Sequence, residues 1–238
     1  MDNTSEIKVG DHRLRAFLAW FGKITLFQLA QIVLCFLFAR ASLFEVLRPF
    51  GLSLYCAAMF TGPAKVLAAV SILIGNLIYS GPYEAIRQLA AVLLFELAIR
   101  FQRLNGNARP TPLNRAATLG LAVLVTGLVK GVVQGFHVYD LVASLLCSAI
   151  AFSASVLIQP ALAQKEDMKP GQYARSGWLT AAKAILFCLI VISLRDLYIS
   201  ELDLSSVMAG LLVLAFARSK GSACGACLGA CVGLLLTL

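Results

Sequence analysis

Residues 100–115, with the sequence RFQRLNGNARPTPLNR, separate two long apolar blocks and carry four arginines. The Asn-Gly-Asn run and the two prolines of this stretch are typical of a loop. Two later gaps are also basic; they carry Lys165, Lys169 and Arg175, and Arg218 and Lys220. Short loops rich in lysine and arginine remain in the cytoplasm, so the chain is predicted to cross a bilayer between these gaps, with its amino terminus inside. The acidic gap at 196–203 is then predicted outside.

The composition also indicates a membrane protein. Of the 238 residues, 60% are hydrophobic and 13% are charged, and the mean hydropathy is +0.85. A soluble domain of this length needs more polar surface to cover one core. The formal net charge of +8 would suggest a nucleic-acid partner in a soluble protein, but here the basic residues lie in loops that flank the membrane. We therefore expect a lipid bilayer as the partner, and no nucleic acid.

Nine apolar blocks are long enough to form transmembrane helices if loops cover the ends of the shorter ones. They are residues 23–41, 46–62, 64–80, 84–101, 116–135, 138–160, 179–198, 204–217 and 221–238. Backbone polar groups have to be paired within lipid, and no block alternates with a period of two as a barrel strand does. The predicted fold class is therefore all-α, a polytopic integral membrane bundle of about nine transmembrane helices.

The two ends of the chain differ from the rest. Residues 1–22 are predicted to form a cytoplasmic segment that partly lies at the headgroups, because basic residues there flank apolar and aromatic ones. Residues 23–238 form the predicted multi-pass domain. Nine crossings from an inside start would leave Leu238 outside, in the middle of an apolar block. This ending indicates a longer protein that has been truncated.

The last apolar block contains glycines every four residues, at Gly221, Gly225, Gly229 and Gly233. Such a ridge lets two helix backbones approach closely in lipid, so it predicts helix packing and self-association. Three cysteines on a neighbouring face of this block could ligate a metal, but a fourth ligand is missing and thiolates are costly to bury in hydrocarbon. We interpret all seven cysteines as small apolar packing residues. No metal or cofactor is predicted.

Charged residues inside the predicted spans are candidates for function. Glu96 is followed four residues later by Arg100, the favourable order for an ion pair within one helix. Lys130 lies toward the outer end of its span, and Asp140 follows across a short turn, which predicts an ion pair between two helices. Structural pairing accounts for all four residues. The sequence contains no catalytic triad, metalloprotease motif, phosphate loop or dinucleotide fingerprint, so this chain is not expected to be an enzyme.

Residues 36–51, FLFARASLFEVLRPFG, resemble the first membrane hairpin of the stage II sporulation protein E family, where an apolar span ends in an Arg-Ala pair before a second span containing Pro-Phe. The glycine-rich block at 221–236 is similar to a later span of that family. The resemblance implies an amino-terminal membrane bundle that a cytoplasmic regulatory segment and a metal-dependent serine/threonine phosphatase domain follow. The metal-binding aspartates of that phosphatase have no counterpart here, so the resemblance supplies no catalytic residue.

The resemblance implies a module that anchors, localises and assembles a sporulation phosphatase in the bacterial cell membrane. It also implies enrichment at the asymmetric division septum, together with the tubulin-like cell-division protein. The alternative is a small-molecule uptake protein of the vitamin-transporter type, which would need a polar cavity at the midplane of the membrane. Asn76, Gln88 and Gln31 are the residues that could line such a cavity.

Overall fold

The computed structural model describes residues 25–42, 47–105, 110–135, 137–162, 176–195, 198–199 and 202–237. The helices in these ranges are α2 (Leu26–Arg40), α3 (Phe50–Ala58), α4 (Gly62–Ser80), α5 (Pro82–Leu104), α6 (Pro112–Val133), α7 (Val138–Leu162), α8 (Ser176–Ser193), α9 (Leu204–Lys220) and α10 (Ser222–Thr237). Two strands of two residues, β1 (Tyr198–Ile199) and β2 (Leu202–Asp203), pair antiparallel between α8 and α9. The segment predicted at residues 1–22 lies outside the described ranges.

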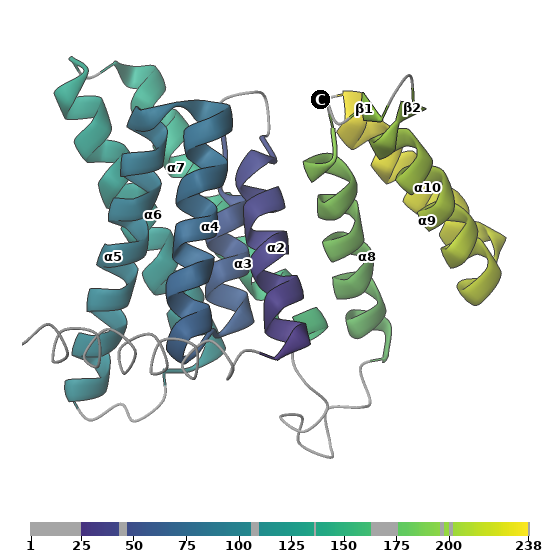
Figure 1. Ribbon diagram of the computed structural model, residues 1–238, viewed down its shortest axis with the longest axis horizontal. Coiled ribbons are helices and arrows are strands. Elements are labelled where there is room, and N and C mark those ends of the chain that lie inside the picture. Colours follow the sequence, from purple (N-terminus) through teal and green to yellow (C-terminus); the bar gives the residue numbers. More distant parts are fainter. Residues whose placement is uncertain are drawn as a thin grey trace, which may run out of the picture.

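Figure 1 shows α2 to α7 as one body, with α8 beside α2 and the α9–α10 hairpin beyond α8. The carboxyl ends of α2 and α4 lie at the upper end of this view. The guanidinium of Arg40 lies 4.1 Å from the ring centroid of Tyr79 and joins these two helix ends. A hydrogen bond of 3.0 Å from Arg40 to the carbonyl oxygen of Arg195 brings the end of α8 to the same place. These three helices therefore run in the same direction.

The opposite, lower end is held by other contacts. Gln102, near the end of α5, donates a hydrogen bond of 3.0 Å to Thr118, near the start of α6. Arg115 of α6 donates to the carbonyl oxygen of Cys56 at 3.2 Å, so the carboxyl end of α3 lies here as well. Helices that follow one another in the sequence therefore alternate in direction. This path is the one expected of a chain that weaves between two faces.

The block predicted as a span at 46–62 contains, in its described residues, the short helix α3 and no helix of full span length. The nine residues of α3 extend about 14 Å at 1.5 Å per residue, which is less than the hydrocarbon thickness of about 30 Å. The block is apolar because it lies inside the protein, where residues 50–57 are all buried. Ser53 donates a hydrogen bond of 3.1 Å to the carbonyl oxygen of Ala151 in α7, which fixes α3 in the interior.

Length and hydropathy distinguish the remaining helices. α4, α6 and α7 are long and apolar enough to cross a membrane. Within α2, α8 and α10 there are apolar stretches that are shorter, between 10 and 17 residues. α5 has 23 residues and contains Glu84, Arg87, Glu96 and Arg100. These apolar helices indicate a membrane location, and three of them meet the length expected of a transmembrane helix.

Small residues allow the helices of the body to pack closely. A Cβ atom on Gly75 of α4 would lie 2.8 Å from the Cβ of Ala39 in α2. One on Gly127 of α6 would lie 2.5 Å from the hydroxyl oxygen of Ser144 in α7. Close approach of backbones at small residues is the main source of helix association in lipid, because burial there removes no apolar surface from water.

Candidate functional site

A charged cluster forms where α5 begins. Gly81 precedes this helix with a φ of 87°, in the left-handed region that glycine tolerates, and Glu84 lies in its first turn. The partial positive charge of a helix amino terminus favours a carboxylate at this position. One turn later, Nε of Arg87 donates hydrogen bonds of 2.9 and 3.0 Å to the two carboxylate oxygens of Glu84. Both side chains are nearly buried, with exposed fractions of 13% and 11%.

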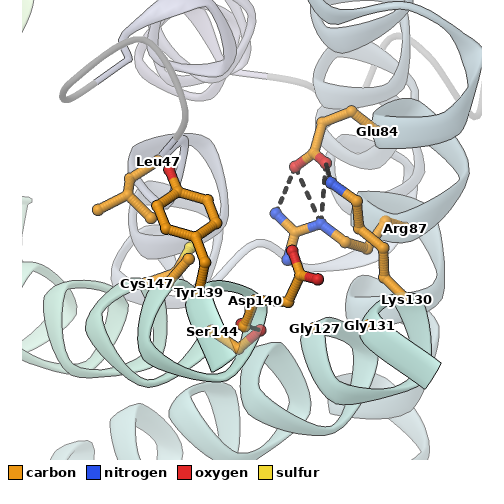
Figure 2. Close-up of a pocket in the computed structure, with 11 residues that line it drawn as sticks. Leu47, Glu84, Arg87, Gly127, Lys130, Gly131, Tyr139, Asp140, Ser144 and Cys147 are labelled. Atoms are coloured by element: carbon orange, nitrogen blue, oxygen red, sulfur yellow. Dashed lines mark hydrogen bonds and ion pairs between the residues drawn. The ribbon is translucent and has the colours of Figure 1, made fainter. Parts of the chain in front are cut away.

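Lys130, in the last turn of α6, extends to the same carboxylate and lies 3.6 Å from it. Figure 2 shows Glu84 held between the side chains of Arg87 and Lys130. A cavity of about 60 Å³ lies beside this cluster, between α5, α6 and α7. Its lining includes Glu84, Arg87, Lys130, Tyr139, Asp140 and Cys147. The space suffices for a few waters and is far smaller than a typical small-molecule site of about 300–1,000 Å³.

The predicted pair of Lys130 and Asp140 is therefore corrected. Lys130 pairs with Glu84 of another helix, whereas the carboxylate of Asp140 accepts a hydrogen bond of 3.3 Å from the backbone N–H of His137. Asp140 lies in the first turn of α7, where it caps its own helix. Sequence proximity suggested the wrong partner, because Glu84 reaches Lys130 only when α5 and α6 pack side by side.

A second charged cluster lies about three turns further along α5, around Glu96. The hydroxyl of Tyr55 in α3 donates a hydrogen bond of 2.8 Å to Glu96, and Lys65 of α4 forms an ion pair with it. Arg100, the predicted partner, is exposed and makes no ion pair with Glu96. A pair within one helix contributes only about 0.2–0.5 kcal/mol. Tyr55 and Lys65 are less exposed than Arg100, so they stabilise the Glu96 carboxylate by more than this amount.

Both clusters hold the short helix α3 in place. Beside the first, Gln88 donates hydrogen bonds to Glu84 at 3.3 Å and to the carbonyl oxygen of Arg48 at 2.8 Å, just before α3. The second binds Tyr55 within α3. This arrangement positions a helix and offers neither an aligned nucleophile and base nor a set of metal ligands. The spacing of Glu84 and Arg87 was the available sequence signal for the first cluster, and sequence analysis missed it.

The four glycines predicted to form a packing ridge have different surroundings. A Cβ on Gly225 would lie 2.5 Å from Ala217 of α9, and one on Gly229 would lie 3.4 Å from Val213. Gly221 instead ends α9 with a φ of 97°. Gly233 has no atom within 4 Å of its Cβ position. Among the described residues, therefore, Gly225 and Gly229 are the two glycines of this set that face the neighbouring helix.

The cysteines also fall into two groups. Cys35, Cys56, Cys147 and Cys188 are buried, whereas Cys224, Cys227 and Cys231 are exposed on α10. In the part of the chain that the structure describes, all seven thiols are free. The same residues include no group of three or more histidine, cysteine or acidic side chains that could hold a metal ion.

The three amides that could serve an uptake function are buried, with exposed fractions of 1% for Asn76 and Gln88 and 3% for Gln31. Asn76 donates to the carbonyl oxygen of Ile72 in its own helix at 2.9 Å. None of the three lines the cavity beside Glu84 or a second cavity of about 160 Å³ at the upper end.

Comparison with known proteins identifies the family. The family model described as "SpoIIE, N-terminal domain" matches residues 5–238, which is nearly the whole chain and confirms the predicted resemblance. Neither the curated proteins nor the solved structures include a significant match. The matched region is the amino-terminal domain and not a phosphatase domain. With its apolar helices, the chain therefore belongs to the SpoIIE N-terminal domain family and is the membrane module of a sporulation protein.

Proposed function

We propose that this chain anchors a sporulation protein in the bacterial cell membrane through nine crossings, with the amino terminus and the basic loops in the cytoplasm. The observation that supports it is the alternating direction of the helices. The carboxyl ends of α5, α7 and α9 point to the same side of the molecule (Figure 1), and each carries basic residues in its last turn or in the stretch that follows. Such stretches are retained on the cytoplasmic side.

The short helix α3 can serve as one of these crossings. Its carboxyl end approaches Arg115 at the lower end, and Arg48, just before its start, contacts Ser80 at the upper end. Non-helical backbone is tolerated at membrane depth when protein surrounds it. The residues of this helix are buried among α2, α6 and α7. The protein around α3 can therefore shield this short helix from lipid within the crossing.

We further propose that the module assembles with copies of itself and gathers at the asymmetric septum with the tubulin-like cell-division protein. The family match supports the sporulation context. Self-association has a candidate surface on α10, where Cys227, Cys231 and Gly233 are exposed. Small side chains of this kind let a second helix approach closely. The cavities described above are too small to favour the alternative of small-molecule uptake.

Cysteine accessibility tests the crossings. In a variant whose native cysteines are replaced by alanine, we expect Asn105→Cys and Ser219→Cys to react with an impermeant maleimide only after the membrane is opened. His137→Cys should react in intact cells, because it joins α6 to α7 at the other face. Labelling of Asn105→Cys and Ser219→Cys from opposite sides would contradict the proposed topology.

Fluorescence microscopy of the full chain in sporulating cells tests the localisation separately. We expect the fusion to concentrate at the asymmetric septum. An even distribution over the membrane would contradict the septal assignment and leave the anchoring role intact. A second fusion, in which Gly233 is replaced by leucine, tests self-association. A leucine side chain at this open position would obstruct a helix from a second copy but would not clash with the described residues of its own chain.

A further inference from the structure

Three arginines line the second cavity, which lies at the upper end of the bundle and has a volume of about 160 Å³. They are Arg40 at the end of α2, Arg48 before α3 and Arg195 after α8. The hydroxyl-bearing side chains of Ser42 and Tyr79 also belong to the lining. The cavity shares no lining residue with the one beside Glu84. It is well above the ~10–15 Å³ that one water requires.

The guanidinium groups of two arginines are held in position. Arg40 lies over the ring of Tyr79 and donates to the carbonyl oxygen of Arg195 at 3.0 Å. Arg48 donates to the hydroxyl of Ser80. A guanidinium has five N–H donors in a fixed planar arrangement, so these hydrogen bonds occupy only a fraction of the available donors. The donors that the described residues leave unoccupied can bind a ligand.

The local charge is not balanced by the helix ends. The carboxyl ends of α2, α4 and α8 meet here, and each contributes about half a negative charge, or about −1.5 in total. Three arginines contribute three positive charges, which leaves an excess of about 1.5. Among the residues that the structure describes, no carboxylate lines the cavity. Glu84 acts on Arg48 from outside the cavity, but Arg87 and Lys130 already pair with this carboxylate. The partial negative charges of the three helix ends therefore compensate only part of the positive charge of the arginines.

We propose that this cavity binds a phosphate group, which can belong to an anionic phospholipid headgroup or to a free anion. Arginine is well suited to phosphate because its parallel N–H groups bind two phosphate oxygens together. A phosphate diester carries one negative charge and matches the remaining excess. The cavity lies at the helix ends of a membrane protein, at the level where headgroups lie, which favours the lipid. The proposal requires a membrane location and does not depend on septal targeting.

Occupation of this site would connect two parts of the molecule. Arg40 and Arg48 belong to the α2–α7 body, whereas Arg195 follows α8, the helix on which the α9–α10 hairpin packs. A phosphate that contacts all three would hold these parts together. We therefore expect lipid binding to stabilise the docking of α8 against α2.

The test uses the full chain in a neutral detergent, with thermal unfolding measured as phosphatidylglycerol, phosphatidylcholine or inorganic phosphate is added. We expect phosphatidylglycerol to raise the unfolding temperature most. Arg48→Gln combined with Arg195→Gln should weaken the apparent affinity by about tenfold or more, since each charge-assisted hydrogen bond contributes about 1.5–3 kcal/mol. Arg103→Gln, at an exposed position at the lower end, should leave the affinity unchanged. Arg195→Lys should retain only part of the affinity, because it keeps the charge but loses the paired N–H groups.

The unfolding temperature without lipid shows whether each variant is folded, and native mass spectrometry of bound lipid gives a second measure of affinity. An equal effect of inorganic phosphate and phosphatidylglycerol would support the site and identify a free anion as its ligand. The proposal is wrong if no added anion shifts the unfolding temperature. That result is expected if the arginines pair instead with Glu45 or Asp196, which are close to them in sequence. It is also wrong if Arg103→Gln weakens lipid binding as much as the double substitution does.

Discussion

The α2–α7 body and the α9–α10 hairpin are both apolar in sequence, yet their packing differs. In the body, buried faces run along every helix, and two charged clusters join α3, α4, α5 and α6. In α9, among the described side chains, only Ser205 is buried. The hairpin reaches α8 through a small cluster around Cys188, Val191, Leu228 and Val232. Hydropathy indicates which helices lie in a membrane. Close contacts at small residues, together with buried hydrogen bonds and ion pairs, determine which of these helices pack firmly.

The largest effect is expected when an ion pair of the α2–α7 body is removed. Glu84→Gln removes the carboxylate that Arg87 and Lys130 share. We expect it to lower the free energy of unfolding by about 3 kcal/mol, since it leaves a nearly buried guanidinium without its counter-charge. Unfolding by SDS in mixed micelles measures the change.

A double-mutant cycle supplies the control for this prediction. Arg87→Gln in the Glu84→Gln background should recover part of the loss, because it removes the uncompensated charge. Lys130→Gln alone should cost less, since Lys130 is 37% exposed and 3.6 Å from the carboxylate. If Lys130→Gln were as destabilising as Glu84→Gln, burial of the Glu84–Arg87 pair would not be the cause.

A smaller effect is expected from a single methyl group at the helix contact of α2 and α4. Gly75→Ala would place its Cβ 2.8 Å from Ala39 Cβ and 2.9 Å from the backbone oxygen of Phe36. We expect a loss of about 1–2 kcal/mol, since the backbones have to separate. Gly210→Ala in α9 is the matched control, because no atom lies within 4 Å of its Cβ position. There the higher helix propensity of alanine should leave stability unchanged or slightly raised.

Sequence analysis predicted the all-α class and the positions of the helices, because apolar blocks and breaking residues are local signals. It could not separate helices that face lipid from the one that is buried. The block containing α3 is as apolar as its neighbours, and only packing against Ala39 and Ala151 shows that protein surrounds it. Local spacing likewise placed Gly225 and Gly229 on one face of α10, but it did not indicate which helix this face would contact.

The charged clusters show the same limit. Glu96 and Lys130 were identified as candidates because they are charged residues inside predicted spans. Their partners, Lys65 and Glu84, come from other helices, and one sequence carries no signal for such contacts. The intrahelical partner of Glu96 was preferred because Arg100 follows it four residues later, in the favourable order for a pair within one helix. Packing of three helices around Glu96 makes a different partner more favourable.

The packing of the hairpin can be disrupted without unfolding the body. Gly225→Leu would clash with Ala217 and should separate α9 from α10. Since α9 contacts the rest of the molecule mainly through α8 and α10, we expect hydrogen exchange to rise in α9 and α10 and to stay unchanged in α4–α7. Gly233→Leu, at an open position, is the control. Faster exchange throughout the body after Gly225→Leu would show that the two regions unfold as one unit.

The smallest expected effect concerns acid and the start of α9. The carboxylate of Asp203 accepts hydrogen bonds from the backbone N–H groups of Ser205 at 3.1 Å and Ser206 at 3.3 Å. Hydrogen bonds from these two serines hold the pKa of Asp203 below its usual value. A lowered pKa means that the cap is fully present above the ordinary value of about 3.9 and is lost as the pH falls through the folded-state pKa.

Amide exchange in lipid nanodiscs should therefore speed up at Ser205 and Ser206 under acid, after correction for the intrinsic pH dependence of exchange. Asp203→Asn should abolish this dependence, because asparagine caps a helix without titrating. In the body, the hydroxyl of Thr111 caps α6 by accepting from Asn114 N–H at 3.3 Å, and it does not ionise in this range. Acid should thus loosen the start of α9 and leave the start of α6 intact. An equal response at both helices would mean that acid acts on the membrane or on the whole fold, and not on the Asp203 cap.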